Sequence, residues 1–137
     1  MELVIVRHAL PESDKRDDGP ADPPLSPLGL RQAEATANLL ATEGVDHVVT
    51  STMQRAIQTG QPLADRLGLT PERLEDLKES DHLRSSYTPV EEMDADHEVI
   101  REFLDDPLSM FADGYETFRD RITTALDAVV ALSLIHI

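Results

Sequence analysis

The sequence predicts one α/β domain, a three-layer sandwich in which helices flank a mainly parallel central sheet. Three observations support this fold class. The 137 residues are 40% apolar, which suffices for a single domain with a buried core. Leu3–Val6 is a continuous aliphatic run, as expected of a strand covered on both faces. Segments with helical periodicity alternate with short β-rich runs, which favours parallel strands joined by crossover helices.

The first helix is expected after a long loop from Leu10 to Pro24 that is rich in proline, aspartate and glycine. Ser26 followed by Pro27 is typical of an N-cap and a first helical position, and Gly44 is typical of a helix end. One face of this helix carries the apolar residues Leu30, Ala33, Ala37 and Leu40.

The second strand is predicted at His47–Thr50 and a short third strand at Arg73–Leu77. Between them, Ser51 or Thr52 is expected to cap a helix that runs toward Gly68. Pro62 lies inside this helix and is expected to bend it without breaking it.

Two further helices are predicted in the second half of the chain. The segment Val90–Asp106 has an apolar face made by Val99, Ile100, Phe103 and Leu104. The segment from Phe118 to Leu132 holds a clearer helical period, with Phe118, Ile122, Ala125, Leu126 and Val129 on one face.

Charge and composition argue against several classes of partner. The chain has 27 acidic and 12 basic residues, a net charge of −15 that repels nucleic acid and anionic membrane surfaces. It has no cysteine and no apolar run long enough for a signal peptide or a membrane span. We therefore expect a cytoplasmic protein without nucleic-acid or membrane partners; the sequence does not predict its oligomeric state.

Three motifs stand out in order along the chain. The pair Arg7 and His8 follows the first predicted strand, Leu25–Ala33 reads LSPLGLRQA, and Ser51–Thr59 reads STMQRAIQT. Each motif alone is a weak signal. Together, in this order and spacing, they resemble the histidine phosphatase superfamily, which includes the phosphoglycerate mutases.

The resemblance implies that His8 is a nucleophile and that Arg7 and Arg55 bind the phosphoryl group of a small phosphorylated substrate. The chemistry agrees, because a neutral imidazole attacks phosphorus well near pH 7 and needs no strong base. Planar guanidinium groups match the charge and geometry of a phosphoryl group better than lysine does. No metal site and no cofactor are expected.

By the same resemblance, Glu79 is the acid that protonates the leaving group, with Asp81 as the alternative. We expect a phosphomonoester hydrolase that acts through a phosphohistidine. A phosphoglycerate mutase-type phosphotransferase and a non-catalytic module that binds phospho-ligands are the alternatives. Acidic residues around the expected entrance favour a phosphatase over a mutase, which handles a bis-phosphorylated sugar acid; these residues are Glu12, Asp14, Asp17, Asp18 and Asp22.

The chain departs from the family pattern at its end. The family places a second catalytic histidine after a later strand, followed by a closing helix, and this segment is not found here. We therefore expect residues 1–131 to form a phosphoglycerate mutase-like domain that lacks its C-terminal strand and helix and is nearly inactive. Leu132–Ile137 matches the translation of transposon-end DNA used in sequencing libraries, so residues 132–137 are expected to be a non-native tail and His136 not to be catalytic.

Overall fold

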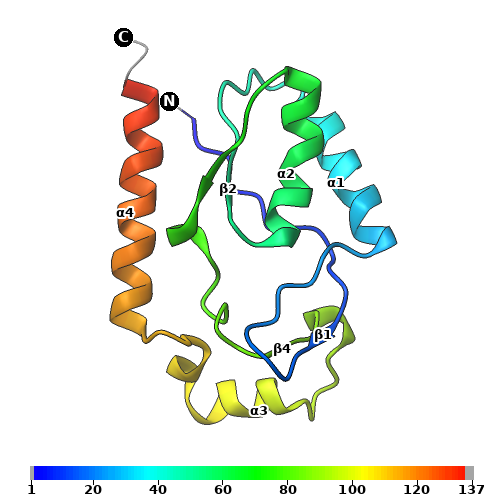
Figure 1. Ribbon diagram of the computed structural model, residues 1–137, viewed down its shortest axis with the longest axis vertical. Helices are drawn as coiled ribbons and strands as arrows, with labels where there is room; N and C mark the ends of the chain where they lie inside the picture. Colours follow the sequence, from blue (N-terminus) through cyan, green and yellow to red (C-terminus); the bar gives the residue numbers. More distant parts are fainter. Residues whose placement is uncertain (1, 135–137) are drawn as a thin grey trace.

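The computed structural model describes residues 2–134, so residues 135–137 of the predicted tail lie outside the described part. Helices α1 (Pro27–Leu40) and α2 (Gln54–Leu67) pack against each other on one side of a short parallel strand pair. Helix α4 (Tyr115–Leu134) lies on the other side of this pair (Figure 1). The α/β character predicted from the sequence is therefore confirmed.

Helix α1 begins where its sequence predicts. Ser26 is the N-cap, and its hydroxyl accepts a hydrogen bond from the backbone N–H of Gly29 at 3.0 Å. Ala33 and Ala37 are buried on one face, and their small side chains allow the close packing of α1 on α2.

Gly29 allows the loop that follows His8 to lie directly on α1. A Cβ atom at this position would stand 2.0 Å from the carbonyl oxygen of Leu10. That same oxygen accepts hydrogen bonds from the backbone N–H and the hydroxyl of Ser26, both at 3.0 Å. The helix start and the loop are thus fixed to each other at a point where no side chain fits.

The parallel strand pair consists of β2 (Val49–Ser51) and β3 (Glu72–Leu74), with Thr50 opposite Arg73. A strand forms near each predicted position, but β2 begins two residues later than predicted. The strand predicted at Arg73–Leu77 ends at Leu74, and its second part is a 3₁₀ turn, η1 (Glu75–Leu77). Helix α2 forms the crossover between them and ends at Gly68 in the left-handed conformation.

The prediction that Ser51 or Thr52 caps α2 is wrong. Met53 occupies the N-cap position, and its side chain makes no capping hydrogen bond. Ser51 still belongs to β2, and the hydroxyl of Thr52 donates to Glu75 Oε2 at 2.6 Å instead of capping the helix. Pro62 lies inside α2, which continues unbroken across it.

The strand predicted at Leu3–Val6 does not form in the described residues. The segment joins no sheet, and its side chains are about half exposed or more, with Ile5 at 82%. A strand needs a backbone partner, and among residues 2–134 no strand pairs with this segment. Instead of one central sheet, the described residues form two small sheets.

The second small sheet pairs β1 (Asp14–Lys15) with β4 (Ser86–Tyr87) in antiparallel orientation. This contact links the proline-rich loop to the segment that follows β3. The loop therefore has a fixed position over the carboxyl end of the parallel strand pair.

The helix predicted at Val90–Asp106 is divided into two elements. A 3₁₀ turn, η2 (Val90–Glu92), precedes helix α3 (Glu98–Asp105), whose N-cap is His97. A further 3₁₀ turn, η3 (Pro107–Met110), leads toward α4, which begins three residues before the predicted helix. No helix within residues 2–134 has the length and apolar character that a bilayer span requires.

Candidate active site

His8 is held in place by α2. The backbone N–H of Ala9 donates to Thr59 Oγ1 at 3.0 Å, and Thr59 donates in turn to the carbonyl oxygen of Arg55 at 2.7 Å. Both Thr59 and the His8 side chain are buried. The Arg-His motif and the start of α2 therefore form one connected unit.

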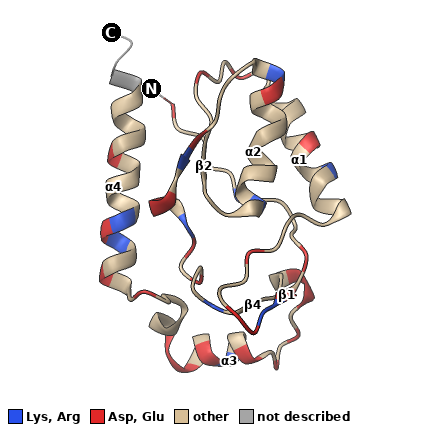
Figure 2. Ribbon diagram, in the orientation of Figure 1, with Lys and Arg blue, Asp and Glu red and all other residues tan. Residues whose placement is uncertain are grey.

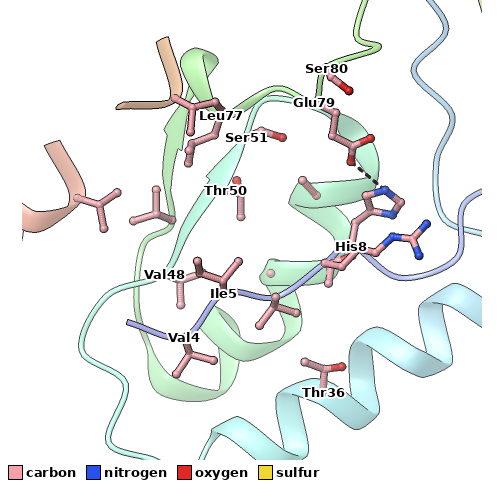
Figure 3. Close-up of a pocket in the computed structure, with 18 of the residues that line it drawn as sticks. Val4, Ile5, His8, Thr36, Val48, Thr50, Ser51, Leu77, Glu79 and Ser80 are labelled. Atoms are coloured by element: carbon pink, nitrogen blue, oxygen red, sulfur yellow. Dashed lines mark ion pairs between the residues drawn. The ribbon is translucent and has the colours of Figure 1, made fainter. Parts of the chain in front are cut away.

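The two ring nitrogens of His8 have different partners. Nδ1 lies 2.8 Å from the carbonyl oxygen of Ala9, and Nε2 lies 2.9 Å from Glu79 Oε1 (Figure 3). A carbonyl oxygen can only accept, so Nδ1 carries a proton and its orientation is fixed. Nε2 is therefore the nitrogen that can present a lone pair to an incoming group, once the proton that it shares with Glu79 has moved to the carboxylate.

Arg55 lies behind Glu79 in the first turn of α2, with only 1% of its side chain exposed. Its Nη2 donates to Glu79 Oε2 at 2.9 Å, and the ring of Tyr87 covers the guanidinium at 4.4 Å. Among the described residues, Nε and Nη1 of Arg55 find no hydrogen-bond partner. Buried donors of this kind are usually satisfied, so the N–H groups of these two nitrogens suit an anionic ligand.

Three carboxylates surround Arg55, and the pKa values of Glu79 and Asp81 shift in opposite directions. Burial alone would raise the pKa of Glu79, but the hydrogen bonds and charges of His8 and Arg55 lower it to about 2. The pKa of Asp81 is raised, because its carboxyl is buried and faces the charge of Glu79. Asp22, the third carboxylate, lies 3.7 Å from Arg55 Nη1.

The pKa of Arg55 itself is raised. Burial would lower it, but the hydrogen bond and the charge of Glu79 outweigh that effect. Arg55 therefore stays charged in a buried position, where its field is weakly screened.

Arg7 does not join this cluster in the structure. Its side chain is 62% exposed, and Nη1 lies 3.5 Å from Glu91 Oε1. Of the four residues predicted for the site, the structure thus brings together His8, Glu79 and Arg55.

The glutamines of the two family-like motifs hold the loop that covers the cluster. Gln32 Oε1 accepts from the backbone N–H of Leu10 at 3.0 Å, and Gln58 Oε1 accepts from that of Leu25 at 2.6 Å. Asp22 Oδ1 accepts from the N–H of Gln54 at 2.9 Å. Figure 2 shows acidic residues along this loop near β1 and along α3, so the surroundings of the site are negative.

His8 and Glu79 line one end of a cavity of about 1490 Å³. Its other walls are largely apolar and come from residues 3–6, from Val48 near β2 and from one face of α4. Figure 3 shows Val4, Ile5 and Val48 in this cavity, away from the His8–Glu79 pair. The predicted aliphatic run therefore faces open space instead of a packed layer. Among residues 2–134, no group of three or more metal-ligating side chains is placed to hold an ion.

Three contacts of the site were not predicted from the sequence. Tyr87 and Asp22 contact Arg55, and Arg121 binds the backbone carbonyl of Glu79. Tyr87 reaches His8 and Arg55 only because β4 pairs with β1. Two-residue strands leave no periodic signal, so the sequence offered no indication of this pairing.

Comparison with known proteins agrees with these features. Residues 3–134 match the family model of the histidine phosphatase superfamily (branch 1). Proteins named "Probable phosphoglycerate mutase GpmB" from Yersinia pestis and Yersinia pseudotuberculosis are 35% identical over 72 residues, which are 51% of this chain. The matched part is 34% of the length of these curated relatives.

Two solved structures with a similar fold are described as phosphatases. A mycobacterial glucosyl-3-phosphoglycerate phosphatase complexed with VO3 is 24% identical, with a TM-score of 0.65 over 90% of this chain and 62% of that one. The alpha-ribazole phosphatase from Shigella flexneri is 19% identical, with a TM-score of 0.62 over 90% of this chain and 65% of that one.

Proposed function

Because the chain belongs to the histidine phosphatase superfamily, we propose that it serves the hydrolysis of a small phosphomonoester through a phosphohistidine on His8. The observation that carries this proposal is the contact between His8 Nε2 and Glu79 Oε1 at 2.9 Å, with the free N–H groups of buried Arg55 beside it. A nucleophile, a proton carrier and an anion-binding group thus lie within one cluster.

In the first step, a proton shared between Nε2 and Oε1 moves to Glu79, and the freed lone pair of Nε2 attacks phosphorus. The bond from phosphorus to the ester oxygen breaks, and Glu79 gives its proton to the departing oxygen. The fixed Nδ1–H of His8, donating to Ala9, keeps Nε2 aimed at the phosphoryl group.

With a pKa of about 2, Glu79 is ionised in the empty site and holds no proton for the leaving group there. The two contacts that lower its pKa are those with His8 and Arg55. When a phosphoryl group arrives, Nε2 turns to phosphorus and Arg55 donates to the phosphoryl oxygens. Both stabilising contacts weaken, and the new negative charge raises the pKa of Glu79 further.

In the second step, water attacks the phosphohistidine while the Glu79 carboxylate takes its proton. The bond between Nε2 and phosphorus breaks, inorganic phosphate leaves, and the lone pair returns to His8. The same carboxylate thus acts as acid and then as base, and the cycle needs no outside reactant except water.

The acidic loop supports hydrolysis over mutase activity. Asp22 lies beside Arg55, and Glu91 pairs with Arg7, so the neighbourhood offers little to a second phosphate group. The curated relatives carry the name phosphoglycerate mutase, which keeps transfer to a sugar acid as the second candidate. Transfer of label to a phosphoglycerate, and not to water, distinguishes the two.

We also propose that turnover by these 137 residues is slow. Arg55 is the one predicted clamp that lies in the cluster, whereas Arg7 faces Glu91. Losing one preorganised donor to the transferred group costs about 10²–10³ in rate in comparable sites. The placement of α1 and α2 on one side of β2–β3 and of α4 on the other supports our proposal of a three-layer sandwich with a mainly parallel central sheet.

Trapping of the phosphoenzyme tests the proposed function even when turnover is slow. The protein is mixed with a ³²P-labelled phosphomonoester, quenched in base, and assayed for bound label that is lost in acid. We expect labelling of the unmodified protein and of His97→Ala, whose ring caps α3, and none of His8→Ala.

Equal labelling of His8→Ala assigns the nucleophile to another residue and overturns the mechanism. Binding of inorganic phosphate without labelling or hydrolysis across a broad substrate panel favours a non-catalytic binding module instead.

A further inference from the structure

The segment that carries Glu79 has little structure of its own. It follows the short turn η1, and Lys78 and Glu79 have no regular secondary structure before a turn at residues 80–83. Glu79 is nevertheless placed within hydrogen-bonding distance of both His8 and Arg55. Something outside the segment must hold its backbone, because irregular segments do not hold a geometry this tightly by themselves.

Arg121 of α4 supplies that support. Its Nη1 donates to the carbonyl oxygens of Asp76, at 2.9 Å, and of Lys78. Its Nη2 donates to the carbonyl oxygen of Glu79 itself at 3.0 Å. One side chain therefore binds three backbone carbonyls within four residues, at Glu79 and at two positions before it.

Arg121 is itself held firmly. Its Nε donates to Asp113 Oδ2 at 2.9 Å, and both side chains are mostly buried, at 13% and 15% exposed. Burial would raise the pKa of Asp113, but the hydrogen bond from Arg121 lowers it, so this carboxyl stays ionised. The guanidinium also lies 4.9 Å from the ring of Phe118, one turn earlier on α4.

Lysine cannot replace this arrangement. A guanidinium offers five N–H donors in a rigid plane, and here the three nitrogens reach four acceptor groups at once. An ammonium group is a single point of charge at the end of a flexible chain. The geometry therefore uses the shape of arginine as well as its charge.

We propose that Arg121 is a positioning residue that fixes the backbone at Glu79 and so holds the Glu79 carboxylate against His8 and Arg55. Its consequence for catalysis rests on the proposed function, whereas its effect on the placement of Glu79 does not. Helix α4, which contributes no residue to the cluster, is thereby coupled to the site.

The test uses Arg121→Lys, with Arg119→Lys as the matched control. Arg119 lies on the same helix, but it is 51% exposed and pairs only with its neighbours Glu116 and Asp120 among the contacts described. The first readout is the pKa of Glu79, followed through its side-chain ¹³C signal as the pH is varied. This readout needs no enzymatic activity.

In Arg121→Lys we expect the pKa of Glu79 to rise by about one unit or more, because its contacts with His8 and Arg55 loosen. In Arg119→Lys we expect the value of the unmodified protein. The second readout is the hydrolysis of a phosphomonoester. We expect kcat to be lower by about tenfold or more in Arg121→Lys than in the unmodified protein, while KM changes little.

An unchanged pKa of Glu79 in folded Arg121→Lys overturns the proposal, even if the variant is less stable, because Arg121 then has only a structural role. If Arg121→Lys does not fold, Asp113→Asn takes its place: a rise in the pKa of Glu79 supports the proposal and an unchanged value overturns it. A protein that forms no phosphohistidine refutes the proposed function, yet the titration of Glu79 still decides the role of Arg121.

Discussion

Glu79 Oε1 lies 2.9 Å from His8 Nε2, and this contact joins a turn after β3 to the loop that follows residues 3–6. The other carboxylate oxygen accepts from Arg55, so one side chain bridges the nucleophile and the anion-binding group. The bridge explains how the site stays ordered while it is empty. In the proposed reaction, the proton passes from Nε2 to Glu79 across this contact before Nε2 attacks phosphorus.

Glu79→Gln should slow the phosphorylation of His8 by an amount that depends on the leaving group. With an alkyl phosphate we expect the rate of phosphorylation to fall by a factor of about 10²–10⁴, because the departing alkoxide then lacks its proton. With 4-nitrophenyl phosphate the loss should be much smaller, since that phenolate leaves without protonation. Rapid-quench measurement of a single turnover isolates this step from the later attack of water.

Asp81→Asn is the control for this prediction. Asp81 Oδ1 lies 4.0 Å from Arg55 Nη2. With the alkyl phosphate, we expect the substitution of Asp81 to reduce the rate of phosphorylation less than the substitution of Glu79 does. The reverse ranking would assign the acid to Asp81, whose raised pKa suits a proton donor.

Arg55→Lys should weaken the binding of orthovanadate, an analogue of the transferred phosphoryl group, by about 10²–10³. The ammonium group cannot reproduce the planar arrangement of Nε and Nη1, which have no hydrogen-bond partner in the empty site. Arg7→Lys should reduce the affinity for orthovanadate less than tenfold, because Arg7 is exposed and pairs with Glu91. Titration by calorimetry compares the variants, and a larger loss for Arg7→Lys would contradict the geometry described above.

Glu79 should also affect stability in acid. Its pKa is lowered from 4.5 in the ordinary state to about 2 in the folded protein, so the folded state binds this proton less tightly than the unfolded state. Its contribution to the free energy of unfolding is therefore complete above about pH 4.5 and is lost as the pH falls toward 2. Urea unfolding between pH 6 and pH 3 should show a steeper loss for the unmodified protein than for Glu79→Gln, whereas parallel curves would show that Glu79 is not held in this way.

Gly29→Ala should destabilise the chain and displace the loop after His8. The added Cβ would meet the carbonyl oxygen of Leu10 at 2.0 Å, and backbone atoms cannot move aside cheaply. We expect a loss of about 1–3 kcal/mol in the free energy of unfolding. Asn38→Ala, on the exposed face of the same helix, should cause no such loss when both are measured by urea unfolding; equal effects would remove the close approach as the cause.

Local signals predicted the helices well. Ser26 and Pro27 marked the start of α1, and Gly68 marked the end of α2, because capping depends on residues adjacent in sequence. The cap predicted at Ser51 or Thr52 failed for a tertiary reason, since Thr52 is engaged by Glu75 of a distant turn.

Strand pairing could not be predicted in the same way. Leu3–Val6 has the composition of a buried strand, but composition does not supply the backbone partner that a strand requires, and the described residues contain none. The supports of the site were equally hidden. Arg121 reaches carbonyl groups more than forty residues away in sequence, and backbone carbonyls leave no pattern in a sequence.

The central claim is that His8 reacts through Nε2, because Nδ1 is held by the carbonyl oxygen of Ala9. Base-quenched phosphoprotein can be digested, and the phosphorylated peptide can be sequenced by mass spectrometry and compared by ³¹P NMR with the two phosphohistidine isomers. We predict phosphate on His8 and on Nε2 alone. Phosphate on Nδ1, or on a residue other than His8, would contradict the account.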